Sequence, residues 1–201
     1  MHYLGKAIMD RYHMIVAAEE QFAREVTLGV IVQRPMTVWH YIIPGMFIID
    51  YLRRGSAISQ YTKHFMFPRK LALDAAGALL EGQDKTSVTS QIEDDISTWL
   101  NSLNLYSQEL LHAQAVVVDL LMDHYFKLLR TDGDTYLFLI KNAYKNRGDF
   151  KALINELTSA EEEVDGKIIE KIGKNKNLKE KLLAEQQQVA KRRQKIMDEI
   201  F

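Results

Sequence analysis

The chain has 201 residues, with 26 basic and 27 acidic side chains, 47% hydrophobic residues, 3 prolines and no cysteine. The absence of cysteine excludes thiol nucleophiles, dithiol redox pairs, cysteine-ligated zinc and cysteine-ligated iron–sulfur clusters. A chain of this size can bury a sizeable core without disulfides or a structural metal, and we expect it to be cytoplasmic.

Positive charge is concentrated in the C-terminal part of the chain. Residues 141–201 contain 14 basic and 11 acidic side chains, a net charge of +3, whereas residues 1–140 carry 12 basic and 16 acidic ones, a net charge of −4. Between residues 173 and 195 there are 8 basic and 2 acidic side chains. We expect any contact with an anionic surface, either a membrane or a nucleic acid, to involve residues 173–195.

Long helices are predicted because proline occurs only at positions 35, 44 and 68. Apolar residues at three- and four-residue steps predict a first helix from about Tyr3 to Val32. Residues 38–52 are the most apolar stretch, but a Pro-Gly pair interrupts it, so we expect a broken helix that cannot span a bilayer. Short helices are expected at residues 56–67 and 69–81, with Gly82 as the C-terminal stop of the second.

The strongest periodic pattern lies between residues 86 and 130. One row of mostly apolar residues runs every seven positions from Ile92 to Leu120, and a second runs from Ile96 to His124 at the a/d offset of a coiled coil. We therefore predict one long central helix, about residues 88–130. Its second half, from residue 110 onwards, is apolar on nearly all sides and should lie at the centre of the protein.

The C-terminal third is also predicted to be helical. A turn at residues 131–134 precedes a helix at 135–147, although a buried strand is the alternative there. The next helix covers residues 149–172, with Ser159-x-x-Glu162 as its capping box. The final helix, residues 178–200, has only a thin apolar stripe. We predict an all-α protein, with a helical bundle domain at residues 1–172 and a semi-detached, charged helical arm at residues 173–201.

Metal-binding candidates form one polar line on the long helix. Glu109-x-x-His112 has the spacing that di-iron bundles use twice, but it occurs once, and Asp119 and Asp123 extend the same line. We favour the interpretation that this line is the solvated face of the helix, the alternative being a divalent-cation site. Glu19 lies in the apolar stripe of the first helix and must be paired, protonated or metal-bound, with an Arg or Lys partner as the usual outcome. If Glu19 faced the 109–123 line, the case for a metal site would become much stronger.

Partner or membrane contacts are predicted in two segments where aromatic, apolar and basic side chains meet. The first surrounds the apolar stretch, which could be core, a protein interface or a membrane-dipping hairpin, and the second is the arm. The candidates are Trp39, Tyr41, Phe47, Arg53 and Arg54 in the first segment, and Lys181, Val189, Arg192, Lys195 and Ile196 in the arm.

These features favour a non-catalytic adaptor or assembly subunit that acts through helix–helix contacts with a protein partner or a second copy of the chain. Phosphate-loop, metalloprotease, serine-hydrolase and EF-hand motifs are absent from the sequence, so we expect no cofactor and identify no small-molecule substrate. The alternatives are a carboxylate/histidine metal-binding bundle with redox or hydrolytic activity, and a peripheral membrane protein that uses residues 38–52.

Overall fold

The computed structural model describes residues 2–32, 54–173 and 176–201, and among these it contains helices and short connections but no strand. The helices are α1 (His2–Val32), α3 (Arg54–Leu80), α4 (Lys85–Ser102), α5 (Gln108–Leu129), α6 (Tyr136–Tyr144), α7 (Arg147–Ile172) and α8 (Lys176–Ile200). The predicted all-α helical bundle is confirmed. The apolar stretch 38–52, with the candidates Trp39, Tyr41 and Phe47, and Arg53 beyond it, lies outside the described residues, and Arg54 is the first residue of α3.

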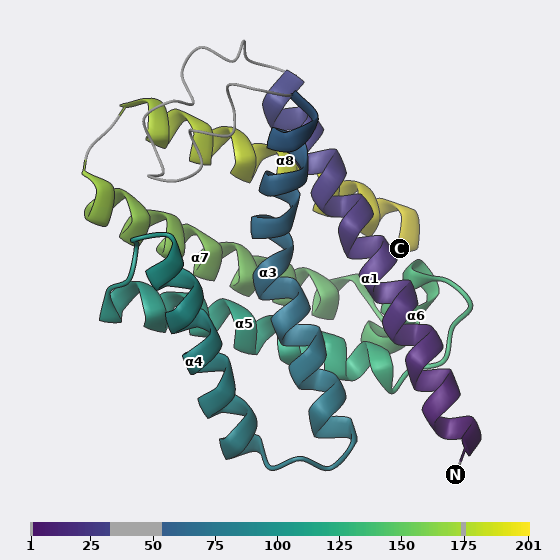
Figure 1. Cartoon of the computed structure of the whole chain (residues 1–201). Coiled ribbons are helices and arrows are strands. Elements are labelled where there is room, and N and C mark those ends of the chain that lie inside the picture. The colour runs from purple at the N-terminus through teal and green to yellow at the C-terminus, as the bar shows by residue number, and fades with distance from the viewer. Residues whose placement is uncertain (1, 33–53, 174–175) are drawn as a thin grey trace.

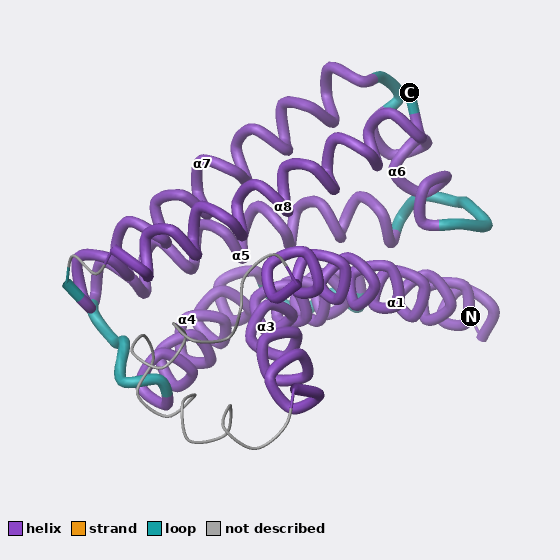
Figure 2. The backbone as a smooth tube through the Cα atoms, turned by 90° about the horizontal axis from the view of Figure 1, so that it is seen from above, coloured by secondary structure: helices purple, strands orange, loops and turns teal. Residues whose placement is uncertain are grey.

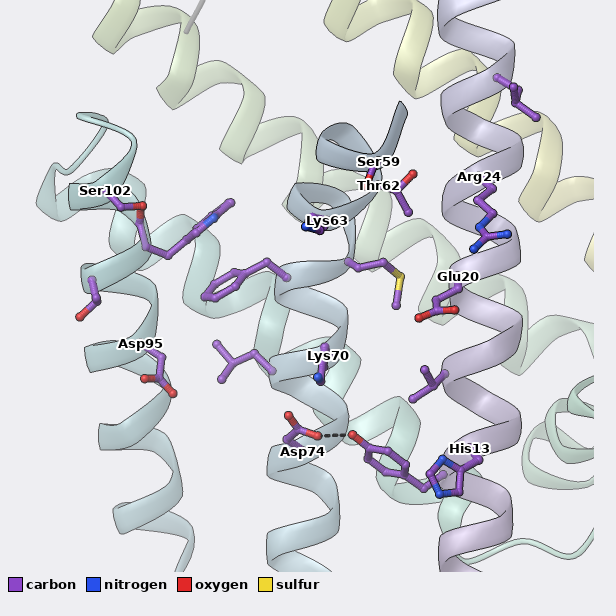
Figure 3. Close-up of a pocket in the computed structure, with 18 residues that line it drawn as sticks. His13, Glu20, Arg24, Ser59, Thr62, Lys63, Lys70, Asp74, Asp95 and Ser102 are labelled. Atoms are coloured by element: carbon purple, nitrogen blue, oxygen red, sulfur yellow. Dashed lines mark hydrogen bonds between the residues drawn. The ribbon is translucent and has the colours of Figure 1, made fainter. Parts of the chain in front are cut away.

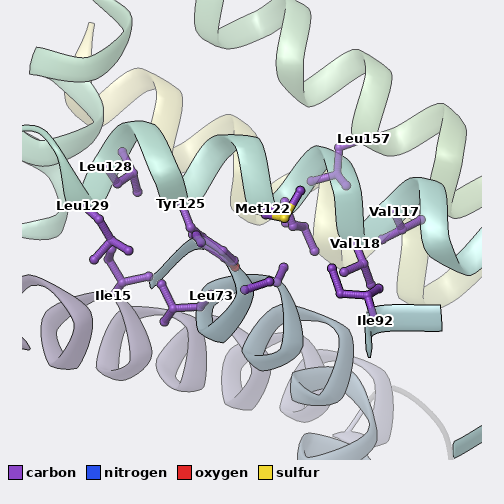
Figure 4. Packing of buried hydrophobic residues seen from close by; sticks show 14 of the residues in the cluster. Ile15, Leu73, Ile92, Val117, Val118, Met122, Tyr125, Leu128, Leu129 and Leu157 are labelled. Carbon is purple, nitrogen blue, oxygen red and sulfur yellow. The ribbon is translucent and has the colours of Figure 1, made fainter. Parts of the chain in front are cut away.

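The helices form two layers that cross each other (Figure 1). In one layer α3 lies between α1 and α4, and in the other α5, α7 and α8 run across behind it. The view from above shows the second layer stacked on the first (Figure 2). The outer face of the α1/α3/α4 layer carries an open groove (Figure 3), whereas its inner face meets α5 in the hydrophobic core (Figure 4).

α5 is the centre of the core, as predicted for residues 110–129. Its Tyr125 and Met122 are almost fully buried, Leu73 of α3 and Ile15 of α1 pack on it from the first layer, and Leu157 of α7 packs from the second (Figure 4). Each such side chain stabilises the fold by about 1.5–3 kcal/mol before the cost of ordering it.

The prediction of one continuous helix over residues 88–130 is wrong, because the chain turns between α4 and α5. Asn104 adopts a left-handed backbone conformation with φ of 57°, and the N–H of Leu105 donates to the carbonyl of Leu100 at 2.9 Å, which is the pattern of a Schellman cap. Ser107 then caps α5 by accepting a hydrogen bond from the N–H of Leu110 at 3.2 Å. The two apolar rows continue through this turn because both helices face the same core.

The two short helices expected on either side of Pro68 are a single helix, α3. Proline removes one backbone donor from a helix, but packing and side-chain contacts hold this segment helical. The Arg69 guanidinium donates to the carbonyl of Phe65 at 3.2 Å, and Phe67 stacks on Trp99 of α4 with ring centroids 4.5 Å apart. The stop after α3 is as predicted, since Gly82 has a φ of 90°.

α7 begins earlier than predicted and does not use the expected capping box. Asn146 is its N-cap, because the side-chain oxygen of Asn146 accepts a hydrogen bond from the N–H of Asp149 at 2.9 Å. Ser159 and Glu162 lie inside the helix. The segment that could have been a strand is helix α6, capped by Thr135.

α8 packs against α1, α6 and α7 of the bundle. Val189 is buried against Phe22 and Val26 of α1, with Ile196 packed beside them, and Met197 joins the main core. The thin apolar stripe is sufficient for this packing because α8 also buries charged surface: Arg193 is buried and pairs with Glu161 of α7. Whether residues 1–172 fold without α8 stays a prediction.

Candidate functional site

A groove of about 1140 Å³ runs over α3 between α1 and α4 (Figure 3). On α1 the lining extends from Tyr12 to Leu28, mostly at every fourth residue, and on α3 it extends from Ser59 to Asp74. With a rise of 1.5 Å per residue, the lining segment of α1 is about 24 Å long. The groove is therefore long enough to hold about four turns of another helix.

The floor of the groove is mainly apolar. Its central side chains are half-buried and come from all three helices of the layer: Val16, Met66, Phe67 and Trp99. Leu28 at one end of the groove is 46% exposed. Covering a mainly apolar floor of this extent with another apolar surface removes it from water and is therefore energetically favourable.

Charged side chains lie beside and between the apolar ones. Tyr12 donates a hydrogen bond to Asp74, which links α1 to α3, and burial together with Asp74 raises the pKa of Tyr12 to about 12. The other charged side chains have no ion-pair partner in the part of the chain that the structure describes. These are Glu20 and Arg24 on α1, Lys63 and Lys70 on α3, and Asp95 on α4.

A buried polar network lies on the other side of α3 and joins five helices. Glu19 of α1 accepts hydrogen bonds from Arg69 Nε at 3.2 Å and from the Tyr136 hydroxyl at 3.0 Å. Arg69 also donates to Glu161 of α7 at 3.3 Å, and Arg193 of α8 holds Glu161 through two bonds of 2.7 and 2.9 Å. Burial opposes the charge of Arg69, but Glu161 and Glu19 outweigh it and raise its pKa. Glu19 therefore has the arginine partner that its buried position requires.

His124 is a core histidine held by a hydrogen bond. Its Nδ1 lies 2.6 Å from the hydroxyl of Tyr144, and burial lowers its pKa to about 3. His124 is therefore neutral near pH 7 and has a structural role among the aromatic side chains of α5, α6 and α7.

The structure does not bring the metal-binding candidates together. Glu109, His112, Asp119 and Asp123 lie along the exposed face of α5, whereas Glu19 points into the core. Nowhere in residues 2–32, 54–173 and 176–201 do three His, Asp or Glu side chains meet in an arrangement that could hold a metal ion. The polar line is the solvated face of α5.

The basic candidates of the arm do not form one exposed row. Lys181 is buried beside a cavity between α3, α7 and α8. The Arg192 Nε atom lies 2.8 Å from Glu25 of α1, and Lys195 pairs with Glu199 within α8. Of the positive charge predicted to attract an anionic surface, Lys181 and Arg193 are buried, whereas Lys176, Lys179, Lys191 and Lys195 are exposed.

Sequence reasoning missed both the groove and the network around Arg69. The groove is assembled from three segments whose relative positions the helix pattern does not give, and the network uses charged residues that the pattern assigns to solvent. One signal was present, because Glu19 stood in an apolar stripe and needed a buried cation.

Across the described helices, none is sufficiently long and apolar to cross a membrane. Comparison of the chain with protein-family models, with curated proteins and with solved structures found no match.

Proposed function

We propose that the protein is a non-catalytic adaptor or assembly subunit, and that the groove over α3 receives an amphipathic helix of a partner protein. The observation that carries this proposal is a groove about four helical turns long, with a mainly apolar floor and with charged side chains that have no ion-pair partner among the described residues. Helix-in-groove recognition combines these features, because the apolar face of the bound helix covers the floor while its flanks meet the charged side chains.

The signs of the charges give the expected pattern on the partner. Lys63 and Lys70 extend from α3 in the middle of the layer, and Asp95 lies on the α4 side (Figure 3). A helix with acidic residues where it meets Lys63 and Lys70, and basic residues where it meets Asp95, would complement both. Such pairs would fix the direction and register of the helix more than its affinity.

A protein partner explains the groove better than a membrane or a nucleic acid does. Those surfaces are uniformly negative, and Glu20 and Asp95 would oppose them. The basic candidates of α8 support the same preference, because Arg192 and Lys195 already have carboxylate partners. The cytoplasm, where chains without cysteine are common, is the compartment we propose for this interaction.

Photo-crosslinking at matched exposed positions tests the proposal. A photo-reactive amino acid replaces Leu28, which is 46% exposed in the groove, or Val116, which is 41% exposed on the solvated face of α5. We expect the Leu28 position to crosslink one protein in cells through an amphipathic helix. A synthetic peptide of that helix should then bind the purified chain, more weakly after Leu28→Glu and equally well after Val116→Glu.

Two results would overturn the helix-docking proposal. The first is equal crosslinking of the same protein from Val116, and the second is peptide binding that Leu28→Glu leaves unchanged. A crosslink between two copies of this chain would instead assign the groove to a homo-oligomer.

A further inference from the structure

A second cavity, of about 260 Å³, lies inside the bundle between α3, α5, α7 and α8. Its volume corresponds to about nine water molecules in the liquid, so it can hold a compound of roughly ten non-hydrogen atoms. The wall is partly apolar, with Val117, Leu182 and Val189, and partly aromatic, with Tyr61 and Phe65. Small-molecule sites in helical bundles combine such a wall with a few convergent polar groups.

Carboxyl groups outnumber cations around this cavity. Four carboxyl groups line it, from Glu161, Glu162, Asp165 and Glu185, against the three cations of Arg69, Lys181 and Arg193. Both arginines are held by Glu161, and Arg69 also pairs with Glu19. The cavity therefore has an excess of negative charge when all of its carboxyl groups are ionised.

Glu162, Asp165 and Glu185 have no ion-pair partner in the described part of the chain, and of these three Glu162 is exposed to solvent, whereas Asp165 and Glu185 are partly buried. Asp165 accepts a hydrogen bond from the neutral amide of Gln186 at 2.7 Å, and the side chain of Tyr61 faces Glu185. Burial raises the pKa of Asp165 to about 6, with Glu161 and Glu162 adding to the effect. Burial likewise raises the pKa of Glu185 to about 7, to which Asp165 and Glu161 contribute.

We propose that this cavity binds a small organic amine in its protonated form, with the ammonium group between Asp165 and Glu185 and the apolar body along Val117, Leu182 and Val189. An ammonium group has three donors and no acceptor, which matches a pair of carboxylates and the neighbouring polar side chains. Hydrogen bonds between two charged groups are about twice as strong as neutral ones. A neutral or acidic compound of the same shape would leave the excess negative charge uncompensated or would increase it.

This proposal predicts that proton release accompanies binding. A bound ammonium stabilises the ionised carboxylates, so any proton that Asp165 or Glu185 holds near pH 6.5 must leave, and the affinity should fall as the pH is lowered from 8 to 5. Other titratable groups face the same two carboxyl groups from each neighbouring helix. They are Tyr61, His64 and Arg69 on α3, Glu161 and Glu162 on α7, and Lys181 and Arg193 on α8.

Isothermal titration calorimetry with 2-phenylethylamine and its neutral isostere 2-phenylethanol tests the proposal on the full chain. At pH 8 we expect the amine to bind about ten- to a hundredfold more tightly than the alcohol, which corresponds to charge-assisted hydrogen bonds of about 1.5–3 kcal/mol. At pH 6.5, titrations in two buffers of different ionisation enthalpy should reveal protons released by the amine only. The Asp165→Asn/Glu185→Gln variant should bind both compounds equally weakly and release no protons.

Glu163→Gln is the matched control, because Glu163 is an exposed carboxylate of α7 and should leave the preference for the amine unchanged. The double variant should melt at or above the temperature of the unaltered protein at pH 8, since it removes carboxylates whose ionisation burial opposes. Equal affinity of the unaltered protein for amine and alcohol would overturn the proposal, as would amine binding without proton release. Should the double variant fail to fold, these two measurements on the unaltered protein still decide the question.

Discussion

The contact between Arg193 of α8 and Glu161 of α7 offers a test of how far buried charges stabilise this bundle. Two hydrogen bonds, of 2.7 and 2.9 Å, join the side chains, and the exposed fraction is only 6% for Arg193 and 25% for Glu161. Arg193→Met keeps a long apolar side chain but removes the guanidinium. Glu161 then retains Arg69 as a cationic neighbour, at 3.3 Å.

We expect Arg193→Met to lower the free energy of unfolding by about 2–4 kcal/mol, somewhat less than the 3–5 kcal/mol typical of breaking a fully buried pair. The expected loss is smaller than the typical one because Glu161 keeps Arg69 as a partner and is partly exposed to water. Glu161→Gln should be similarly destabilising, since it leaves two guanidinium groups without their shared carboxylate. The double variant removes both partners, so its loss of unfolding free energy should be smaller than the sum of the losses of the two single variants. The difference, which is the coupling energy, should be about 1.5–3 kcal/mol.

Urea denaturation followed by circular dichroism measures all four proteins of this cycle. The ion pair between Arg147 and Asp198 is a matched control, because it also joins α7 to α8, at 2.6 Å, but its side chains are 47% and 52% exposed. Water and salt screen such a pair, so its coupling energy should lie within error of zero. Equal coupling energies in the two cycles would refute the reasoning that burial makes the Arg193–Glu161 pair strong.

Three further predictions concern stability. Truncation after Lys176 should lower the urea midpoint of unfolding and broaden the transition, because it exposes the apolar face of α1 that Val189 covers. An unchanged midpoint would instead support the prediction that residues 173–201 form a semi-detached arm. Gly166→Ala, where an added Cβ meets open space inside α7, should raise the free energy of unfolding by about 0.5–1 kcal/mol. Gly133→Ala should lower the free energy of unfolding, because the added Cβ would lie 2.9 Å from the backbone nitrogen of Leu139. Equal melting temperatures for Gly166→Ala and Gly133→Ala would contradict these two predictions. As the pH falls from 6.5 towards 4, His124 should lower the free energy of unfolding by up to about 1.4 kcal/mol per pH unit. The reason is that the imidazole binds a proton in the unfolded chain but not in the folded one, where its pKa is about 3. The His124→Gln variant should therefore show a shallower pH dependence in thermal melts.

The sequence predicted helices well where one apolar face ran without interruption. The predicted range of the first helix differs from α1 by one residue, and buried apolar side chains follow its stripe from Ile15 to Val30. The same pattern could not reveal the turn at Asn104, since apolar periodicity reports which residues face a core and not whether the backbone between them is continuous. The local signals for that turn were an Asn able to adopt positive φ and Ser107 as a cap, and both are weaker than two unbroken heptad rows.

The candidate site was less predictable because charged residues occupy inward positions. On α8 the inward side chains follow a four-residue step, Lys181, Glu185, Val189, Arg193 and Met197, so charged and apolar side chains share one face. On α7, Glu161 and Asp165 stand four residues apart and face them. Each helix taken alone looks solvated on this side, and only the pairing of the two shows that the charges are buried.

The packing of α8 against α1 also affects the chain while it is being synthesised. The apolar face around Val26 is covered by Val189, which lies roughly 160 residues further along the chain. At about 5–20 residues per second, a ribosome needs on the order of 10–30 s to make that intervening length. During this interval the α1 face is available to chaperones or to the wrong partner helix. Closing so distant a contact should also make the final docking step slow compared with the formation of the helices themselves.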